Sequence, residues 1–180
     1  MAYSFEIANI LTIGEEFQRS SPHKGCLFAD YLLSEIPSDI QKKIADSYNS
    51  VLKKFGEENS DFLTAVKDLT AARCKTLISE APVPDGIYCQ SVGSIMKKAR
   101  SGKFPLNLSY HLAKHFDGPN DGLVGEISFA WGQKYTLLMP SGKRGISHGD
   151  MIDLNRENIR GFDVREFYVN LVNDLKNKGL

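Results

Sequence analysis

The chain has 180 residues, with 22 Lys and Arg against 22 Asp and Glu, so its formal net charge is zero. Hydrophobic residues make up 42% and charged residues 24%, the proportions of an ordinary globular domain. The length fits one domain over residues 1–180. The charge balance indicates no basic field for nucleic acid and no polybasic segment for an anionic membrane. No apolar run approaches the roughly 18 residues of a membrane span.

The N-terminus and the cysteines bear on the cellular compartment. The start, MAYSFEIANILTIGEEF, lacks the basic region of a signal peptide. Cys26, Cys74 and Cys89 are too few and too scattered for a disulfide framework or a zinc site, and we expect them to be small buried residues. A cytoplasmic location is the default interpretation, and the compartment of the intact protein is left open.

The first forty residues predict one strand and one short helix. Residues 7–13 (IANILTI) form a brief, Ile-rich run that is typical of a strand. A polar stretch over residues 15–21 follows, and residues 22–25 (PHKG) indicate a loop. Apolar residues between Phe28 and Leu33 then predict a short helical segment, which ends before Pro37.

Two helices are predicted between residues 38 and 80. Ser38 and Gln41 have the spacing of a capping box. One apolar stripe with helical spacing follows, formed by Ile40, Ile44, Tyr48, Val51, Leu52 and Phe55. A second helix begins after Ser60 and places Leu63, Val66 and Leu69 inward. The segment 81–86, which contains two prolines, ends this pattern.

The remaining elements predict an α/β protein. Residues 86–92 (GIYCQSV) alternate like a strand. Asp163 and Glu166 can cap a last helix that ends at Gly179. Its apolar face, which we expect to be core, consists of Val164, Phe167, Tyr168, Leu171, Val172 and Leu175. Two or three strands bordered by helices indicate part of an α/β sheet.

Two segments carry residues suited to acid–base chemistry. Asp121 lies in a turn, GPNDGLV over residues 118–124, that can hold its carboxylate rigidly. His148 lies in residues 145–154 (GISHGDMIDL), between glycines that permit unusual backbone conformations. A carboxylate that orients an imidazole is the Asp–His half of a nucleophilic relay. Taken alone, each residue is ordinary loop chemistry, and only their combination favours a site.

These segments resemble a known family. NDGLV followed by SHGDMIDL is similar to the C-terminal part of bacterial triacylglycerol lipases of the α/β-hydrolase superfamily. Residues 21–25 (SPHKG), followed by Phe28-Ala29-Asp30, are similar to the TPHRG…AD segment of those lipases. The resemblance implies a carboxylic ester hydrolase with a lipid or ester substrate, in which Asp121 and His148 are catalytic.

The resemblance also implies an architecture. The chain corresponds to the C-terminal half of an α/β-hydrolase sheet, and the helices over residues 37–82 fall where such lipases insert a lid. Residues 86–92 fall on a later strand of the sheet. Asp150 resembles a position at which some of these lipases hold a structural calcium, although the sequence indicates no second carboxylate partner. His23 is expected to have a structural, hydrogen-bonded role.

The nucleophile is missing from its expected place. The family carries a Gly-x-Ser-x-Gly elbow before the Pro-His-Gly segment, and residues 1–21 contain no such motif. Residues 14–20 (GEEFQRS) are a further departure from the family pattern, in which the strand is followed almost directly by the Thr-Pro-His loop. We therefore expect the serine to come from sequence upstream of Met1, or from an N-terminal hydrolase fragment, and the chain alone to be inactive.

Two alternatives stay open, and one possible metal site is set aside. Ser91 in Cys89–Gly93 (CQSVG) is a replacement nucleophile with Cys89 at the first glycine position of the elbow. The chain can instead be a non-catalytic remnant or a lipid- or protein-binding module that exposes the stripe through Ile44, Val51 and Phe55. His111 and His115 lie four residues apart, but without further ligands they predict solvated residues on a helix.

Overall fold

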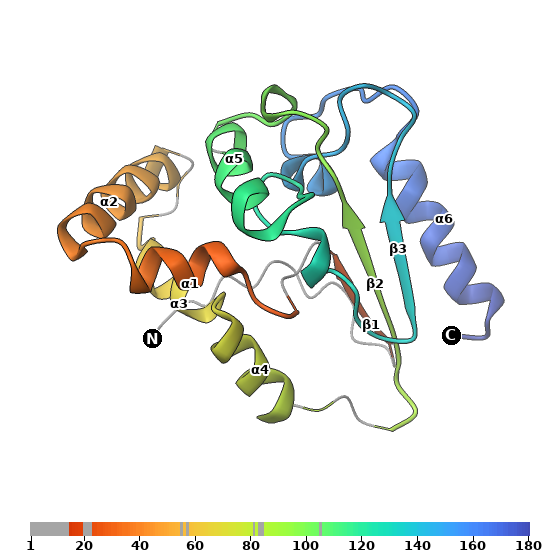
Figure 1. The fold of residues 1–180 in the computed structure, drawn as a ribbon. Helices are drawn as coiled ribbons and strands as arrows, with labels where there is room; N and C mark the ends of the chain where they lie inside the picture. Colours follow the sequence, from red (N-terminus) through yellow and green to blue (C-terminus); the bar gives the residue numbers. More distant parts are fainter. Residues whose placement is uncertain are drawn as a thin grey trace.

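The computed structural model describes residues 15–19, 23–54, 56, 58–80, 82, 85–104 and 106–180, and Figure 1 shows a sheet with helices beside it. The strands are β1 (Glu15–Arg19), β2 (Tyr88–Ser94) and β3 (Lys134–Leu138), which lie in this order in the sheet. Both pairings are parallel, so the carboxyl ends of all three strands lie at one edge. This confirms a partial α/β fold.

β1 lies where the sequence predicts a polar, non-strand segment, and that prediction is wrong. Its backbone pairs with β2 from Glu15 opposite Tyr88 to Arg19 opposite Val92. Strand formation here follows from pairing with β2 and not from an apolar pattern, because strand propensity depends strongly on context. The strand predicted over residues 7–13 lies outside the described residues. β1 ends at Arg19, four residues before His23 in the sequence.

Four helices separate β1 from β2: α1 (Leu27–Ser34), α2 (Ser38–Lys54), α3 (Phe62–Asp68) and α4 (Ala71–Glu80). Three of them, α2, α3 and α4, lie in the described part of segment 37–82, where the sequence predicts two, and Figure 1 shows them to one side of the sheet. The capping arrangement at the start of α2 differs from the prediction. The backbone amides of Ile40 and Gln41 donate to the Pro37 carbonyl. The Gln41 side chain donates to the Ile36 carbonyl at 2.7 Å.

The helices share a small core of their own, formed by Cys26, Ala29, Leu32 and Val66. Ile44 of α2 packs against this core, and the rings of Tyr48 and Phe62 stack with their centroids 4.4 Å apart. The apolar stripe of α2 is therefore packed against its own chain at Ile44 and Tyr48. This contradicts the expectation of an exposed stripe at Ile44, whereas the Val51 side chain and Phe55 lie outside what the structure describes.

β2 is the central strand and is buried on both faces. All its residues from Cys89 to Ser94 are buried, which removes the alternation predicted over residues 86–92. Val92 packs with Ile146 and Met151 in a second core cluster beneath the loop that carries His148. The loop is therefore supported by a buried strand of the sheet.

The elements after β2 are η1 (Ala99–Ser101), α5 (Leu106–Asp117), η2 (Glu126–Ser128), η3 (His148–Ile152) and α6 (Val164–Asn177). Asp163 caps α6 as predicted, because its carboxylate accepts the amides of Arg165 and Glu166. The α6 face is only partly core. Phe167 packs against the cluster of Val92, Ile146 and Met151, but no α6 residue is fully buried and Val172 is 57% exposed.

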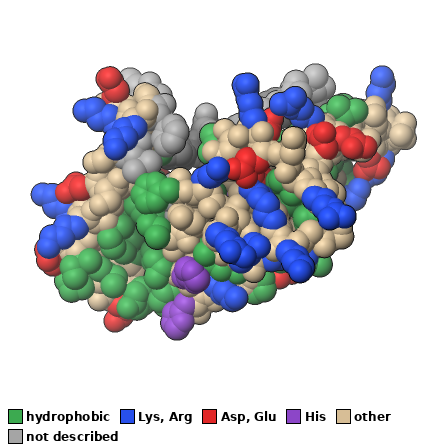
Figure 2. Space-filling view, turned by 90° about the horizontal axis from the view of Figure 1, so that it is seen from above, with side chains coloured by type: hydrophobic (Ala, Val, Ile, Leu, Met, Phe, Trp, Pro, Cys, Tyr) green, Lys and Arg blue, Asp and Glu red, His purple; other side chains and the backbone are tan. Residues whose placement is uncertain are grey.

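Figure 2 views the molecule from above Figure 1, onto the carboxyl ends of the strands. Hydrophobic side chains gather toward the helical side of this face, and Lys and Arg gather over the loops on the other side. Within the residues that the structure describes, no helix combines the length and apolar character needed to cross a bilayer.

Gly93 lets β2 approach the segment after η2 closely. A Cβ at this position would lie 2.4 Å from the Phe129 ring, and Phe129 is fully buried. We predict that Gly93→Ala lowers the free energy of unfolding by about 1–3 kcal/mol through overpacking. Urea unfolding measures the change. Gly142→Ala is the control, because its Cβ would meet only the Arg160 carbonyl at an ordinary 3.5 Å. Equal effects of the two substitutions would contradict the overpacking argument.

Candidate active site

Asp121 and His148 lie side by side at the carboxyl edge of the sheet. The Asp121 carboxylate is completely buried, and its Oδ2 lies 2.8 Å from His148 Nδ1. The other oxygen, Oδ1, accepts the backbone amides of Leu123 at 3.0 Å and Val124 at 2.8 Å. The His148 side chain is 13% exposed. The carboxylate is thus held by its own turn, with one oxygen directed at the imidazole.

The turn that holds Asp121 is organised by the neighbouring Asn120, which the sequence analysis did not single out. Asn120 is completely buried, and its Oδ1 accepts the Gly122 amide at 2.9 Å. Its Nδ2 donates to the carbonyls of Gly118 at 2.9 Å and Tyr110 at 3.3 Å. The Asn-Asp-Gly sequence could have indicated this role, because Asn and Asp side chains in turns often form hydrogen bonds with the backbone two residues further on.

Backbone hydrogen bonds join the loops that meet at the pair. The His148 amide donates to the Asp121 carbonyl at 2.8 Å. The Met96 amide, just after β2, donates to the Asn120 carbonyl at 2.8 Å, and the Ile146 amide donates to Ile95 at 2.9 Å. The approach of Asp121 to His148 is therefore fixed by main chain as well as by side chains.

This geometry selects one tautomer of the imidazole. An ionised carboxylate only accepts hydrogen bonds, so the neutral His148 ring carries its proton on Nδ1. The Nε2 atom then has the lone pair and can take up a proton from another group. The arrangement can therefore act as an oriented base.

The tautomer can be tested by nitrogen NMR of the His148 ring. We predict that the wild-type neutral ring shows Nδ1 protonated and Nε2 unprotonated. In Asp121→Asn the amide can also donate, and we expect a mixed or reversed tautomer population with the fold unchanged. Leu123→Ala, in the same turn, is the control and keeps the wild-type tautomer. An Nε2-protonated ring in the wild type would contradict the assignment.

Ser147 caps the 3-10 helix on which His148 lies. Its backbone amide and its Oγ each donate to Asp150 Oδ2 at 2.7 Å, and its Oγ accepts the Asp150 amide at 3.3 Å. Residues 145–149 (GISHG) match the letters of a Gly-x-Ser-x-Gly motif, a match that the sequence analysis missed. Ser147 is buried in a capping box and does not lie on a strand-to-helix elbow. Its surroundings are those of a structural residue.

Asp150 is bonded to an arginine and does not fit the calcium role that the resemblance implies. Arg144 Nη1 lies 2.5 Å from Asp150 Oδ2, and Nη2 lies 3.1 Å from Oδ1. The same guanidinium reaches Glu157 Oε2 at 2.5 Å. Hydrogen bonds from Lys103 and Arg144 hold the pKa of Glu157 below its usual range. The described residues also contain no group of three or more His, Cys, Asp or Glu that could hold a metal ion.

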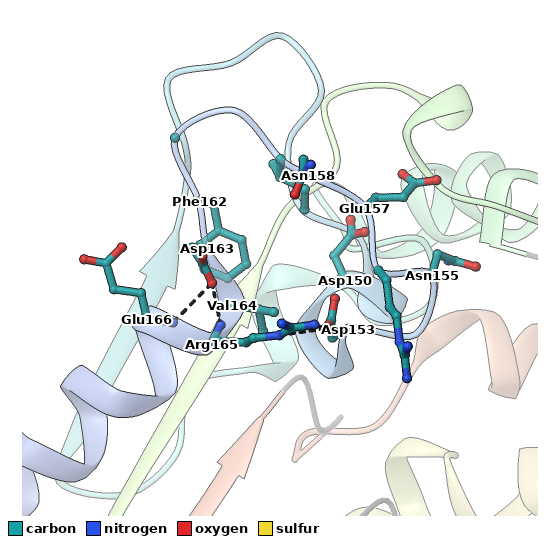
Figure 3. A pocket seen from close by; sticks show the side chains of 13 residues that line it. Asp150, Asp153, Asn155, Glu157, Asn158, Phe162, Asp163, Val164, Arg165 and Glu166 are labelled. Atoms are coloured by element: carbon teal, nitrogen blue, oxygen red, sulfur yellow. Dashed lines mark hydrogen bonds and ion pairs between the residues drawn. The ribbon is translucent and has the colours of Figure 1, made fainter.

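A polar cavity of about 580 Å³ lies beside η3, lined by side chains between Asp150 and Glu166 (Figure 3). Arg165 pairs with Asp153 at 2.9 Å in its wall. Asp153 and Arg156 both adopt left-handed backbone conformations, with φ of 53° and 49°. Neither Asp121 nor His148 lines this cavity, so it is separate from the pair.

The alternative nucleophile Ser91 lies in the middle of β2 and is 1% exposed. Its Oγ donates to the Trp131 carbonyl at 2.8 Å and accepts the Trp131 amide at 2.9 Å. An elbow serine must stand on a tight turn after a strand, exposed to substrate. Ser91 instead joins β2 to the segment before β3, which contradicts the Ser91 hypothesis.

The sequence predicts a hydrogen-bonded role for His23, but in the structure its side chain makes a packing contact instead. Its ring stacks on Trp131 with centroids 5.0 Å apart, and its Nε2 is buried without a hydrogen-bond partner in the described part of the chain. Only its backbone amide bonds, to the Ser128 carbonyl at 3.0 Å. Burial lowers the pKa of His23 to about 4. Ser21 and Pro22 of the same motif lie outside the described residues.

We predict that His23 makes the fold sensitive to acid. Between pH 6.5 and about 4 the unfolded chain binds a proton at His23 that the folded chain does not, so stability is complete above pH 6.5 and falls below it. The loss reaches roughly 3 kcal/mol at most. Urea unfolding, followed by the fluorescence of Trp131, the single tryptophan, measures it. His23→Phe should reduce the loss over this range, and equal pH dependence in both proteins would refute the assignment.

The other candidate residues have structural surroundings. His111 and His115 are exposed on α5, as predicted. None of the three cysteines is in a disulfide and all are buried, and burial together with Asp117 raises the pKa of the Cys26 thiol to about 12. Asp117, which the sequence analysis missed, accepts the Leu27 amide at 2.9 Å and ties the start of α1 to the end of α5.

Comparison with known proteins gives a likeness of fold. No protein-family model matches the chain, and no curated protein matches it in sequence. The crystal structure of Staphylococcus hyicus lipase is similar, with a TM-score of 0.59 and 14% identity. The match covers 88% of this chain and 55% of the lipase chain. Most of this chain therefore has a lipase-like fold, and it spans about half the length of that lipase.

Proposed function

We propose that this chain supplies the acid and base of a Ser-Asp-His relay in a lipase-like carboxylic ester hydrolase. The observation that supports the proposal is the 2.8 Å contact between His148 Nδ1 and the completely buried Asp121 carboxylate. A buried carboxylate that is held by its own turn and aimed at a partly exposed imidazole is suited to this role. The lipase-like fold adds support, at low sequence identity.

In this proposal His148 Nε2 takes the proton from a serine hydroxyl while the serine oxygen attacks the ester carbonyl. Asp121 orients the ring and stabilises the imidazolium that forms. His148 then gives the proton to the leaving alcohol as the acyl-enzyme is produced. Water, deprotonated by the same imidazole, releases the acid and restores the serine.

The serine and the oxyanion donors come from sequence upstream of Met1 or from another polypeptide. Among the described residues, β1 has a strand neighbour on one side only, namely β2. A further parallel strand beside β1 would end at the same edge of the sheet as the loops that carry Asp121 and His148. A serine on the turn after such a strand is the arrangement that the proposal requires.

The helices α2, α3 and α4 serve as the lid in this proposal. They occupy the connection between β1 and β2 and are joined to the chain by segments on either side of residues 37–82. Val66 of α3 packs with Cys26, Ala29 and Leu32 in the small core, so this cover rests on α1.

The first test is the esterase activity of this chain by itself. We predict that the wild-type chain hydrolyses p-nitrophenyl butyrate no faster than His148→Ala, because the nucleophile is absent. His111→Ala, which removes an exposed histidine of α5, is the control for hydrolysis by surface imidazole. A rate that depends on His148 in the isolated chain would refute the claim that the serine lies elsewhere.

The second arm tests the relay itself. The coding DNA upstream of Met1, translated in all frames, should encode a strand followed by Gly-x-Ser-x-Gly. In the extended product, His148→Ala or Asp121→Ala should lower kcat by about 10³–10⁴-fold, and His111→Ala should not. Unchanged kcat in both variants of an active extended protein would overturn the proposed function.

A further inference from the structure

Two segments at the carboxyl edge of the sheet carry most of the excess positive charge. Segments 95–104 and 139–161 contain eight Lys and Arg and three Asp and Glu. Since the whole chain has 22 of each, the rest has fourteen Lys and Arg against nineteen Asp and Glu. We name these two segments the basic loop surface. The chain is neutral overall, but these two segments carry a net positive charge and the rest of the chain a net negative one.

The fold, and not the linear sequence, brings these charges together. The Lys97 amide donates to the Arg144 carbonyl at 3.0 Å, and Met96 forms an isolated antiparallel bridge with Gly145. Lys103 Nζ lies 2.8 Å from Glu157 Oε1. These contacts join parts of the chain that are about fifty residues apart into one continuous surface, and Figure 2 shows Lys and Arg gathered over the loops of this face.

The acidic residues within this surface are already paired. Asp150 and Glu157 both bond to Arg144, and Glu157 also bonds to Lys103. In contrast, Lys98, Arg100, Lys143, Arg156 and Arg160 form no ion pair with any carboxylate in the described part of the chain. Five cationic side chains are thus available for an anionic partner.

The same surface exposes large apolar side chains. Phe104 is 53% exposed, Ile152 43% and Leu154 62%. Met139, the residue after β3, is 64% exposed. Ile152 is the last residue of the helical turn that begins with His148, and Leu154 lies two residues further on, so these two apolar side chains are close in sequence to the candidate site.

We infer that the basic loop surface binds an anionic lipid–water interface. Cations attract the negatively charged headgroups, and exposed apolar side chains enter the boundary between headgroups and acyl chains. Binding in this orientation would present His148 to the lipid layer. The inference goes beyond the proposed ester hydrolysis and does not require it, because a surface can bind lipid without hydrolysing it.

The apolar members favour lipid over nucleic acid. Binding to a phosphate backbone requires cations and polar groups, and gains little from exposed aliphatic side chains such as Ile152 and Leu154. An interfacial surface uses both kinds of side chain. The presence of both cationic and exposed apolar side chains on this face therefore favours a lipid surface over nucleic acid as the partner.

The test is sedimentation of the purified chain with vesicles. One set consists of phosphatidylcholine alone, and the other of equal parts phosphatidylcholine and phosphatidylglycerol. We predict binding to the anionic vesicles that is at least tenfold stronger than to the neutral ones at about 0.1 M salt, and a smaller difference at about 1 M salt.

Two double variants locate the surface. Arg100→Glu/Lys143→Glu should bind anionic vesicles at least roughly tenfold more weakly, since each basic residue contributes separately. Lys42→Glu/Lys75→Glu makes the same change in net charge on exposed positions of α2 and α4, and should bind as the wild type does. All four residues are exposed, and circular dichroism verifies that the variants are folded. Equal weakening by both double variants would overturn the inference.

A third variant tests the apolar contribution. Phe104→Ser/Leu154→Ser should lose the binding that persists at high salt. If this variant binds normally and duplex DNA competes with vesicles for the wild type, the surface is a nucleic-acid site and the inference is wrong. Sedimentation measures binding without hydrolysis, so its failure leaves the proposed relay standing, and failure of the relay leaves the lipid surface standing.

Discussion

The need to satisfy one buried carboxylate shapes the carboxyl edge of the sheet. Asp121 is completely buried, and an ionised group without partners at such a position would cost several kcal/mol. Its Oδ1 receives two backbone amides of its own turn, and its Oδ2 faces His148. The backbone carbonyl of Asp121 also accepts the His148 amide. Two contacts therefore hold the carboxylate and two hold His148 against it, so the ring is oriented before any substrate or partner arrives.

A second buried carboxylate stabilises the other side of the histidine. Asp150 accepts hydrogen bonds from Ser147 and forms a two-point ion pair with Arg144. Because Arg144 also bonds to Glu157, the helical turn that carries His148 is tied to the segment that follows it. The Arg144 guanidinium supplies the positive charge that balances the Asp150 carboxylate.

Sequence reasoning fails where the partners of a residue are distant along the chain. Asp121 and His148 were singled out by the combination of their two segments and by the resemblance that these segments carry, because each residue alone is ordinary loop chemistry. β1 was missed because its polar residues become a strand only through pairing with β2. Ser91 and Ser147 both resemble nucleophiles in their short motifs, but their bonds to Trp131 and Asp150 decide their roles. The ring of His23 was misjudged because its stacking on Trp131 joins residues more than a hundred positions apart.

The same limit explains why composition alone misjudges the surface. Net charge sums over the chain without regard to position, whereas a partner meets only the charges on one face. A parallel sheet collects the loops after its strands at one edge, so residues 97–103 and 143–160 become neighbours although long segments separate them. Asp150 and Glu157 of these loops form ion pairs with Arg144 and Lys103, so they do not neutralise the other Lys and Arg side chains of the surface. A chain with zero net charge can therefore present a cationic face, and this face is the one that carries His148.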